Sequence, residues 1–168
     1  MRKVCLIIGA GAGIGMATAR RFAKEGDYVC LVRRSNQKGL DKSIHELTTN
    51  GYEATGFIVD VTVPDDLEAL VEKIETEIGP IDTAVYNVGA QIGDRYLDST
   101  TLKVFELGWK LGTFGLFRLA KTLLPCMVKR STGSLLVTGA TASVRGNGGQ
   151  HSHCLLYTSD AADEEDSV

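Results

Sequence analysis

Short apolar segments alternate with amphipathic segments along most of this chain. Five apolar runs have the length of buried parallel strands, at residues 3–8, 28–33, 55–60, 81–86 and 134–138. Between them, apolar residues recur at helical spacing over about residues 13–25, 37–49, 65–78 and 101–129. We expect the last helix, the longest, to break near Gly108 or Gly112. The repeated strand–helix–strand units predict an α/β fold, a Rossmann-like, doubly wound parallel sheet of about five strands.

Four glycines lie within seven residues directly after the first apolar run, in Gly9-Ala10-Gly11-Ala12-Gly13-Ile14-Gly15. A strand, a glycine turn and a helix present backbone N–H groups and a helix N-terminus to a phosphate, because no side chain keeps the phosphate away. The spacing Gly-x-Gly-x-x-Gly fails at Ile14, whereas Gly-x-x-x-Gly-x-Gly holds with Gly9, Gly13 and Gly15. The sequence therefore predicts a dinucleotide site, with a purely structural turn as the alternative.

Charged residues at the end of the second predicted strand bear on the choice of dinucleotide. This strand ends in Arg33-Arg34, where an acid would suit the ribose hydroxyls of NAD. Guanidinium groups instead pair bidentately with a phosphate such as the 2′-phosphate of NADP. We therefore predict NADP rather than NAD as the cofactor. Two solvated arginines at a strand end are the alternative interpretation.

Further motifs complete a family resemblance. Asp60-Val61 closes the third predicted strand, Asn87-Val88-Gly89 follows the fourth, and Leu124-Pro125 and Gly133–Val137 end the long helix and form the fifth strand. Together with the glycine spacing, these motifs resemble the short-chain dehydrogenase/reductase family across nearly 150 residues. The resemblance implies an oxidoreductase that transfers a hydride between NADP(H) and a small-molecule alcohol/carbonyl pair. It also implies the strand order 3-2-1-4-5 and the pairing of family members through the helix at 101–129.

The resemblance assigns cofactor contacts to particular residues. It implies that Gly9, Gly13, Ile14 and Gly15 hold the pyrophosphate and that Arg33 and Arg34 contact the 2′-phosphate. It further implies that Asp60 meets the adenine, that its neighbour Val61 belongs to the cofactor site, and that Asn87 and Gly89 lie at the inner ribose.

The family's catalytic residues are not matched in this sequence. The family uses a Tyr as general acid/base and a Lys four residues later, which lowers the pKa of the phenol. No lysine follows Lys129, and His153 stands where the Tyr is expected. Gly112 replaces the family's helix Asn, Ala140 aligns with its Ser, and Thr141 is the one plausible remnant of the catalytic hydroxyl. Catalysis by this chain therefore stays open, and the alternative to an enzyme is a non-catalytic dinucleotide-binding module or fragment.

Composition sets the remaining expectations. The resemblance ends at about Gly149, so we expect an incomplete NAD(P)-binding domain over 1–149, truncated after its fifth strand, and a disordered or foreign acidic tail over 150–168. A net charge of -3 indicates no nucleic-acid partner, and no apolar run reaches the roughly 18 residues of a membrane helix. The scattered cysteines and the tight His151-x-His153-Cys154 cluster predict no metal site. We expect a cytoplasmic protein, because the first strand leaves no room for a signal peptide.

Overall fold

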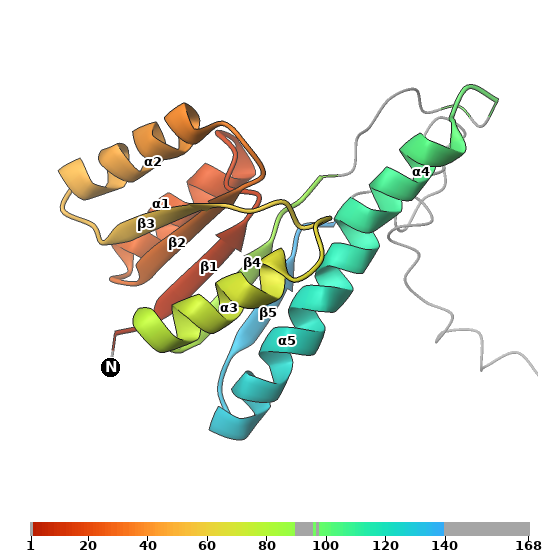
Figure 1. Ribbon diagram of the computed structural model, residues 1–168. Helices are drawn as coiled ribbons and strands as arrows, with labels where there is room; N and C mark the ends of the chain where they lie inside the picture. Colours follow the sequence, from red (N-terminus) through yellow and green to blue (C-terminus); the bar gives the residue numbers. More distant parts are fainter. Residues whose placement is uncertain (1, 90–95, 97, 140–168) are drawn as a thin grey trace, which may run out of the picture.

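The computed structural model describes residues 2–89, 96 and 98–139. Its centre is a five-stranded parallel sheet in the order β3-β2-β1-β4-β5, as Figure 1 shows. The strands are β1 (Val4–Ile8), β2 (Tyr28–Arg33), β3 (Ala54–Ile58), β4 (Ile81–Tyr86) and β5 (Ser134–Val137). The predicted fold class and strand order are confirmed.

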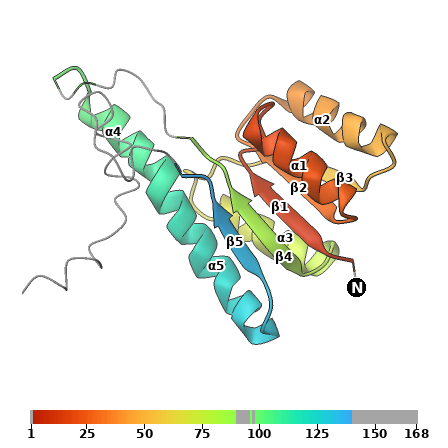
Figure 2. The same cartoon turned by 180° about the vertical axis from the view of Figure 1, so that it is seen from behind.

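Helices cover both faces of the sheet (Figure 2). One face carries α1 (Ile14–Lys24) and α2 (Gln37–Thr49), and the other carries α3 (Asp66–Glu77) and α5 (Gly115–Arg130). Alternate residues of β1 pack against the two helical layers: Leu6 packs with α3 and α5, and Ile7 packs with α1 and α2. Both are fully buried, and each such side chain stabilises the fold by about 1.5–3 kcal/mol. The continuous apolar run in the sequence therefore reflects burial on both faces.

The third strand is shorter than predicted. It ends at Ile58, whereas the predicted strand extends to residue 60. Asp60 Oδ1 accepts hydrogen bonds from the backbone N–H of Thr62 at 2.9 Å and from its hydroxyl at 2.7 Å. This side-chain turn bends the chain out of the sheet and toward α3.

The long predicted helix continues through its glycines. It comprises α4 (Leu102–Trp109), a π-helical turn at Lys110–Phe114 and α5, so the expected break near Gly108 or Gly112 is wrong. The helix widens at Gly112 instead, as π-helical turns often do within an α-helix. By length and hydropathy, Leu102–Arg130 would also suffice to cross a membrane. Here Leu119, Leu123 and Met127 of that helix pack into the core against the sheet.

Candidate cofactor site

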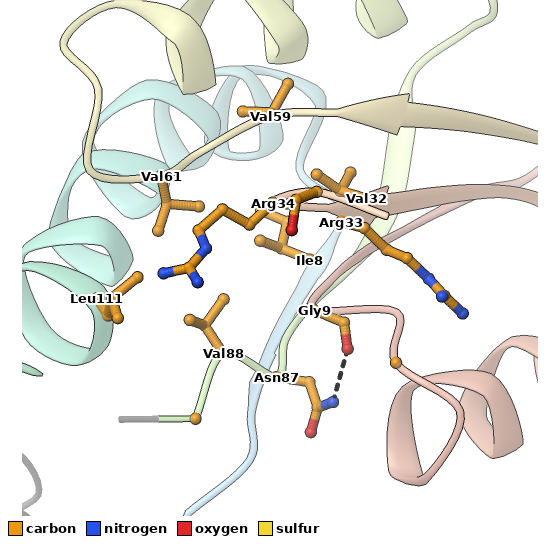
Figure 3. A pocket seen from close by; sticks show the side chains of 13 residues that line it. Ile8, Gly9, Val32, Arg33, Arg34, Val59, Val61, Asn87, Val88 and Leu111 are labelled. Atoms are coloured by element: carbon orange, nitrogen blue, oxygen red, sulfur yellow. Dashed lines mark hydrogen bonds between the residues drawn. The ribbon is translucent and has the colours of Figure 1, made fainter. Parts of the chain in front are cut away.

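A cavity of about 440 Å³ opens at the carboxyl ends of the strands, where the chain order reverses between β1 and β4. In doubly wound sheets this is the position at which ligands bind. Figure 3 shows the side chains that surround it. The lining comes from the glycine turn, the ends of β1 to β4 and the π-helical turn: Ile8, Gly9, Gly11, Val32, Arg33, Arg34, Ser35, Val59, Val61, Asn87, Val88, Gly89 and Leu111.

The glycines of the turn have two different roles. Gly9 has a φ of +90°, and a Cβ there would collide with the backbone carbonyl of Asn87. A Cβ on Gly15 would collide with the carbonyl oxygen of Gly9. At Gly11 and Gly13, by contrast, a Cβ would meet no atom within 4 Å. Gly9 and Gly15 are therefore required by packing, whereas Gly11, which lines the cavity, and Gly13 leave the backbone bare.

The start of α1 is suited to an anion. Its N-cap is Gly13, which supplies no side-chain hydrogen bond, and its first turn contains no acid. The partial positive charge of the helix N-terminus is therefore not offset by a neighbouring carboxylate. Ile14 begins the helix with 62% of its surface exposed, beside the open backbone of the turn. A pyrophosphate fits this combination of bare backbone and uncapped helix.

Asn87 joins the glycine turn to the end of β4. Its Nδ2 donates to the carbonyl of Gly9 at 2.9 Å, the dashed line in Figure 3, and its backbone N–H donates to Ile8 at 2.8 Å. Val88 and Gly89 then continue along the cavity. The amide thus fixes the turn in place. The implied contact of Asn87 and Gly89 with the inner ribose stays a prediction.

The two adjacent arginines point in different directions (Figure 3). Arg33 Nε donates to the carbonyl of Ala10 at 2.7 Å, and its Nη2 donates to the Ser43 hydroxyl at 2.8 Å. Gly39 leaves room for this side chain, since a Cβ there would lie 2.5 Å from Arg33 Nη1. Arg34 extends instead across the cavity toward Val61 and Leu111. Arg33 therefore braces the glycine turn against α2, and Arg34 presents its charge to the cavity.

The remaining predicted residues lie at different depths. Val61 lines the cavity and is 4% exposed, whereas one Asp60 oxygen is engaged in the turn to Thr62. Thr141 lies outside the described residues. Seven of the lining residues were not predicted, namely Ile8, Gly11, Val32, Ser35, Val59, Val88 and Leu111. Gly11 could have been found from the glycine run, but Leu111 comes from a helix whose place over the cavity depends on tertiary packing.

The cavity is electropositive. Arg34 presents its positive charge to the cavity, Arg33 lies at its margin with its guanidinium bound to Ala10 and Ser43, and none of the described residues that line the cavity is an acid. The nearby buried thiol of Cys30 adds no charge, because burial raises its pKa to about 12. The site thus favours a ligand with negative charge at the end of β2 as well as at the start of α1.

A parallel sheet with a glycine turn at its switch point, an uncapped helix start and a basic cavity defines a dinucleotide-binding α/β domain. A family model described as short chain dehydrogenase matches residues 3–154. The chain belongs to the short-chain dehydrogenase family, which confirms the resemblance. This family consists of NAD(P)-binding oxidoreductases.

Named relatives agree with this assignment. The chain is 30% identical over 152 residues to 3-oxoacyl-(acyl-carrier-protein) reductase FabG of Thermotoga maritima, which covers 88% of this chain and 59% of the relative. It is 30% identical over 141 residues to 2,3-dihydro-2,3-dihydroxybenzoate dehydrogenase of Bacillus subtilis, covering 84% of the chain and 53% of the relative. The chain thus spans somewhat more than half the length of these relatives.

Solved structures share the fold. NAD+-bound xylitol dehydrogenase superposes with a TM-score of 0.86 at 28% identity, over 93% of this chain and 60% of that chain. A gluconate 5-dehydrogenase from Burkholderia cenocepacia, in complex with NADP and tartrate, superposes with a TM-score of 0.84 at 22% identity, over 93% of this chain and 60% of that chain. One of these structures holds NAD+ and the other NADP.

Proposed function

We propose that this chain binds NADP(H) in the cavity at the end of β2, as part of an NADP-dependent oxidoreductase. The observation that carries the proposal is the direction of Arg34, which extends over a cavity whose described lining contains no acid. A guanidinium group there attracts a 2′-phosphate, and an acid, which would repel it, is missing from that lining.

The cavity suggests how the cofactor would be placed. The pyrophosphate would lie over Gly11 and Gly13 at the start of α1, where the backbone is open. The adenosine end would then extend toward Arg34 and Val61. When bound, the nicotinamide supplies hydride transfer with an alcohol/carbonyl pair, as the family resemblance implies.

The test compares the Kd values of NADPH and NADH by cofactor fluorescence. Wild-type chain should bind NADPH more tightly, and Arg34→Ala should weaken NADPH binding by roughly 10- to 100-fold, the value of a charged hydrogen bond, with little effect on NADH. Arg21→Ala is the matched control, because Arg21 is an exposed arginine on α1 that pairs with Glu25. Equal affinity for both dinucleotides, or the same loss in both variants, would contradict the proposal.

A non-catalytic dinucleotide-binding module is the second candidate function. It is favoured by the sequence after Lys129, which contains no Tyr-x-x-x-Lys pair. Incubation with NADPH and a panel of ketones and aldehydes distinguishes the two. Oxidation of NADPH would support the enzyme, whereas tight binding without turnover would support the module.

We further propose that two copies pair through the helix at 101–129. Leu102 is 89% exposed, Phe117 59% and Val128 76%, so this helix presents several large apolar side chains on its surface. Large apolar side chains left exposed along one helix favour association. Sedimentation velocity of the chain tests for a dimer.

A further inference from the structure

A buried arginine links the long helix to the loop beside the cavity. Arg118 lies on α5 with 9% of its surface exposed. Its Nε donates to Glu68 Oε1 at 2.7 Å, and its Nη2 donates to Glu68 Oε2 on α3. Its Nη1 donates to two backbone carbonyls, those of Val61 and Val63, each at 2.9 Å. One guanidinium group thus joins α5, α3 and the β3–α3 loop.

The loop that Arg118 holds forms one wall of the cavity. Val61 lines the cavity and is 4% exposed, and its carbonyl faces Arg118. Asp60 forms a turn within the loop: its carboxylate accepts a hydrogen bond from Thr62, and its carbonyl accepts one from Val63 N–H at 3.0 Å. The internal turn sets the shape of the loop, and Arg118 attaches that shape to the long helix.

The same helix supplies a neighbouring part of the wall. Its π-helical turn places Leu111 at the cavity, and Leu111 and Val61 both lie on the side toward which Arg34 extends (Figure 3). Leu111 is part of the long helix, and Val61 is attached to that helix by its hydrogen bond from Arg118. Both wall residues are therefore fixed relative to the helix. We infer that Arg118 is a positioning residue that anchors the Val61 wall for the adenosine end of the cofactor. The cofactor part of this inference rests on the proposed function.

The chemistry of the contacts requires an arginine. The planar guanidinium directs donors at both oxygens of Glu68 and at the two carbonyls simultaneously, which a single ammonium nitrogen on a lysine cannot match. The hydrogen bonds from Arg118 lower the pKa of Glu68, and those to Glu68 raise the pKa of Arg118. Both groups therefore stay charged near neutral pH, and the guanidinium remains available to the loop.

The chain contains a matched control on the same helix. Arg130, at the end of α5, donates to Glu75 at 2.7 Å and 3.2 Å and to the carbonyl of Ile81 at 3.0 Å. Ile81 begins β4, so this second arginine–glutamate pair lies at the amino ends of the strands, whereas the cavity lies at their carboxyl ends. Arg118→Met and Arg130→Met thus remove the same chemistry, next to the cavity and far from it.

Three measurements on the 168-residue chain decide the inference. Thermal unfolding gives the stability of each variant, and fluorescence titration with NADPH, well below each melting temperature, gives the Kd. Hydrogen exchange without cofactor follows the amides of Thr62 and Val63, both bonded within the loop. Both variants should be less stable than wild type. Only Arg118→Met should weaken NADPH binding, by roughly ten-fold or about 1.4 kcal/mol, and speed exchange at these two amides.

Equal Kd values for the two variants, or equal exchange at Thr62 and Val63, would overturn the inference. If Arg118→Met does not fold, Arg118→Lys is compared with Arg130→Lys by the same criteria. If wild-type chain binds no NADPH, the proposed function fails by itself. The exchange comparison still decides whether Arg118 anchors the loop.

Discussion

Tyr86 and Gly115 pack against each other where β4 meets the long helix. Tyr86 is 2% exposed, and its hydroxyl donates to the carbonyl of Leu111 in the π-helical turn. A Cβ on Gly115 would lie closer to that hydroxyl oxygen than the 3.0 Å limit of real contacts. The tyrosine hydroxyl therefore occupies the space that the glycine leaves, and the two residues should be energetically coupled.

Single substitutions at this pair should each destabilise the fold. Tyr86→Phe removes a buried hydrogen bond, which costs about 1 kcal/mol. Gly115→Ala overfills the core at a cost of about 1–3 kcal/mol. In the double variant the new methyl group takes the place of the missing hydroxyl, so we expect a favourable coupling of about 1 kcal/mol. The rescue should be partial, because Val61 Cγ2 at 3.2 Å and the Lys110 carbonyl at 3.3 Å still crowd the methyl group.

The assay is urea unfolding of the wild type, both single variants and the double variant, followed by circular dichroism. The free energies of unfolding form a double-mutant cycle, and thermal melts check it, with about 2–4 °C expected per kcal/mol for a chain of this size. Additive losses, with a coupling within about 0.3–0.5 kcal/mol of zero, would refute the reasoning. The hydroxyl and the glycine would then not share one space.

Two further predictions concern the glycine turn and the long helix. Gly15→Ala should lower the melting temperature, because its Cβ collides with the Gly9 carbonyl. Gly13→Ala should keep the wild-type melting temperature, since its Cβ meets no protein atom within 4 Å, but it should weaken NADPH binding, because the proposed pyrophosphate position lies over that backbone. Thermal melts and fluorescence titration measure both variants, and equal melting temperatures would contradict the division of roles among the glycines. Phe117→Lys should abolish dimers in sedimentation velocity without lowering the melting temperature, and Ile58→Lys, 40% exposed on β3, should leave them intact. A dimer that survives Phe117→Lys would refute pairing through this face.

The strands and the glycine turn were predictable because their signals are local. A run such as Val4–Ile8 is apolar at every position, which a strand buried on both faces requires. Gly15 likewise reflects a contact within the turn, with Gly9 and Ala10, whereas Gly9 also lies against Asn87 after β4, which neighbours β1 in the sheet. Alternation and right-handed crossovers predict a doubly wound parallel sheet but leave several strand orders open, and the family resemblance supplied the order 3-2-1-4-5.

The features that were missed depend on partners far along the chain. The helix around Gly112 was expected to break because glycine weakens a helix, yet it widens there into a π-helical turn whose Leu111 carbonyl bonds Tyr86, 25 residues away. No local sequence pattern indicates that hydrogen bond between Tyr86 and Leu111. Arg118 could not be predicted for the same reason. It follows an apolar segment, as many helix residues do, and its partners, Glu68 on α3 and the Val61 carbonyl, lie far away in the sequence.

The two arginines at the end of β2 show which part of the site could be predicted from sequence and which part could not. Their position beside the cavity follows from the strand and turn, which local sequence sets, so a basic site could be predicted. Their division of roles could not, because it depends on Ala10 and Ser43, which bind Arg33, and on Gly39, which leaves it room. Once Arg33 is committed to the turn and α2, the charge that extends across the cavity is that of Arg34. Substitution of Arg34 should therefore alter cofactor choice, and substitution of Arg33 should alter first the stability of the turn itself.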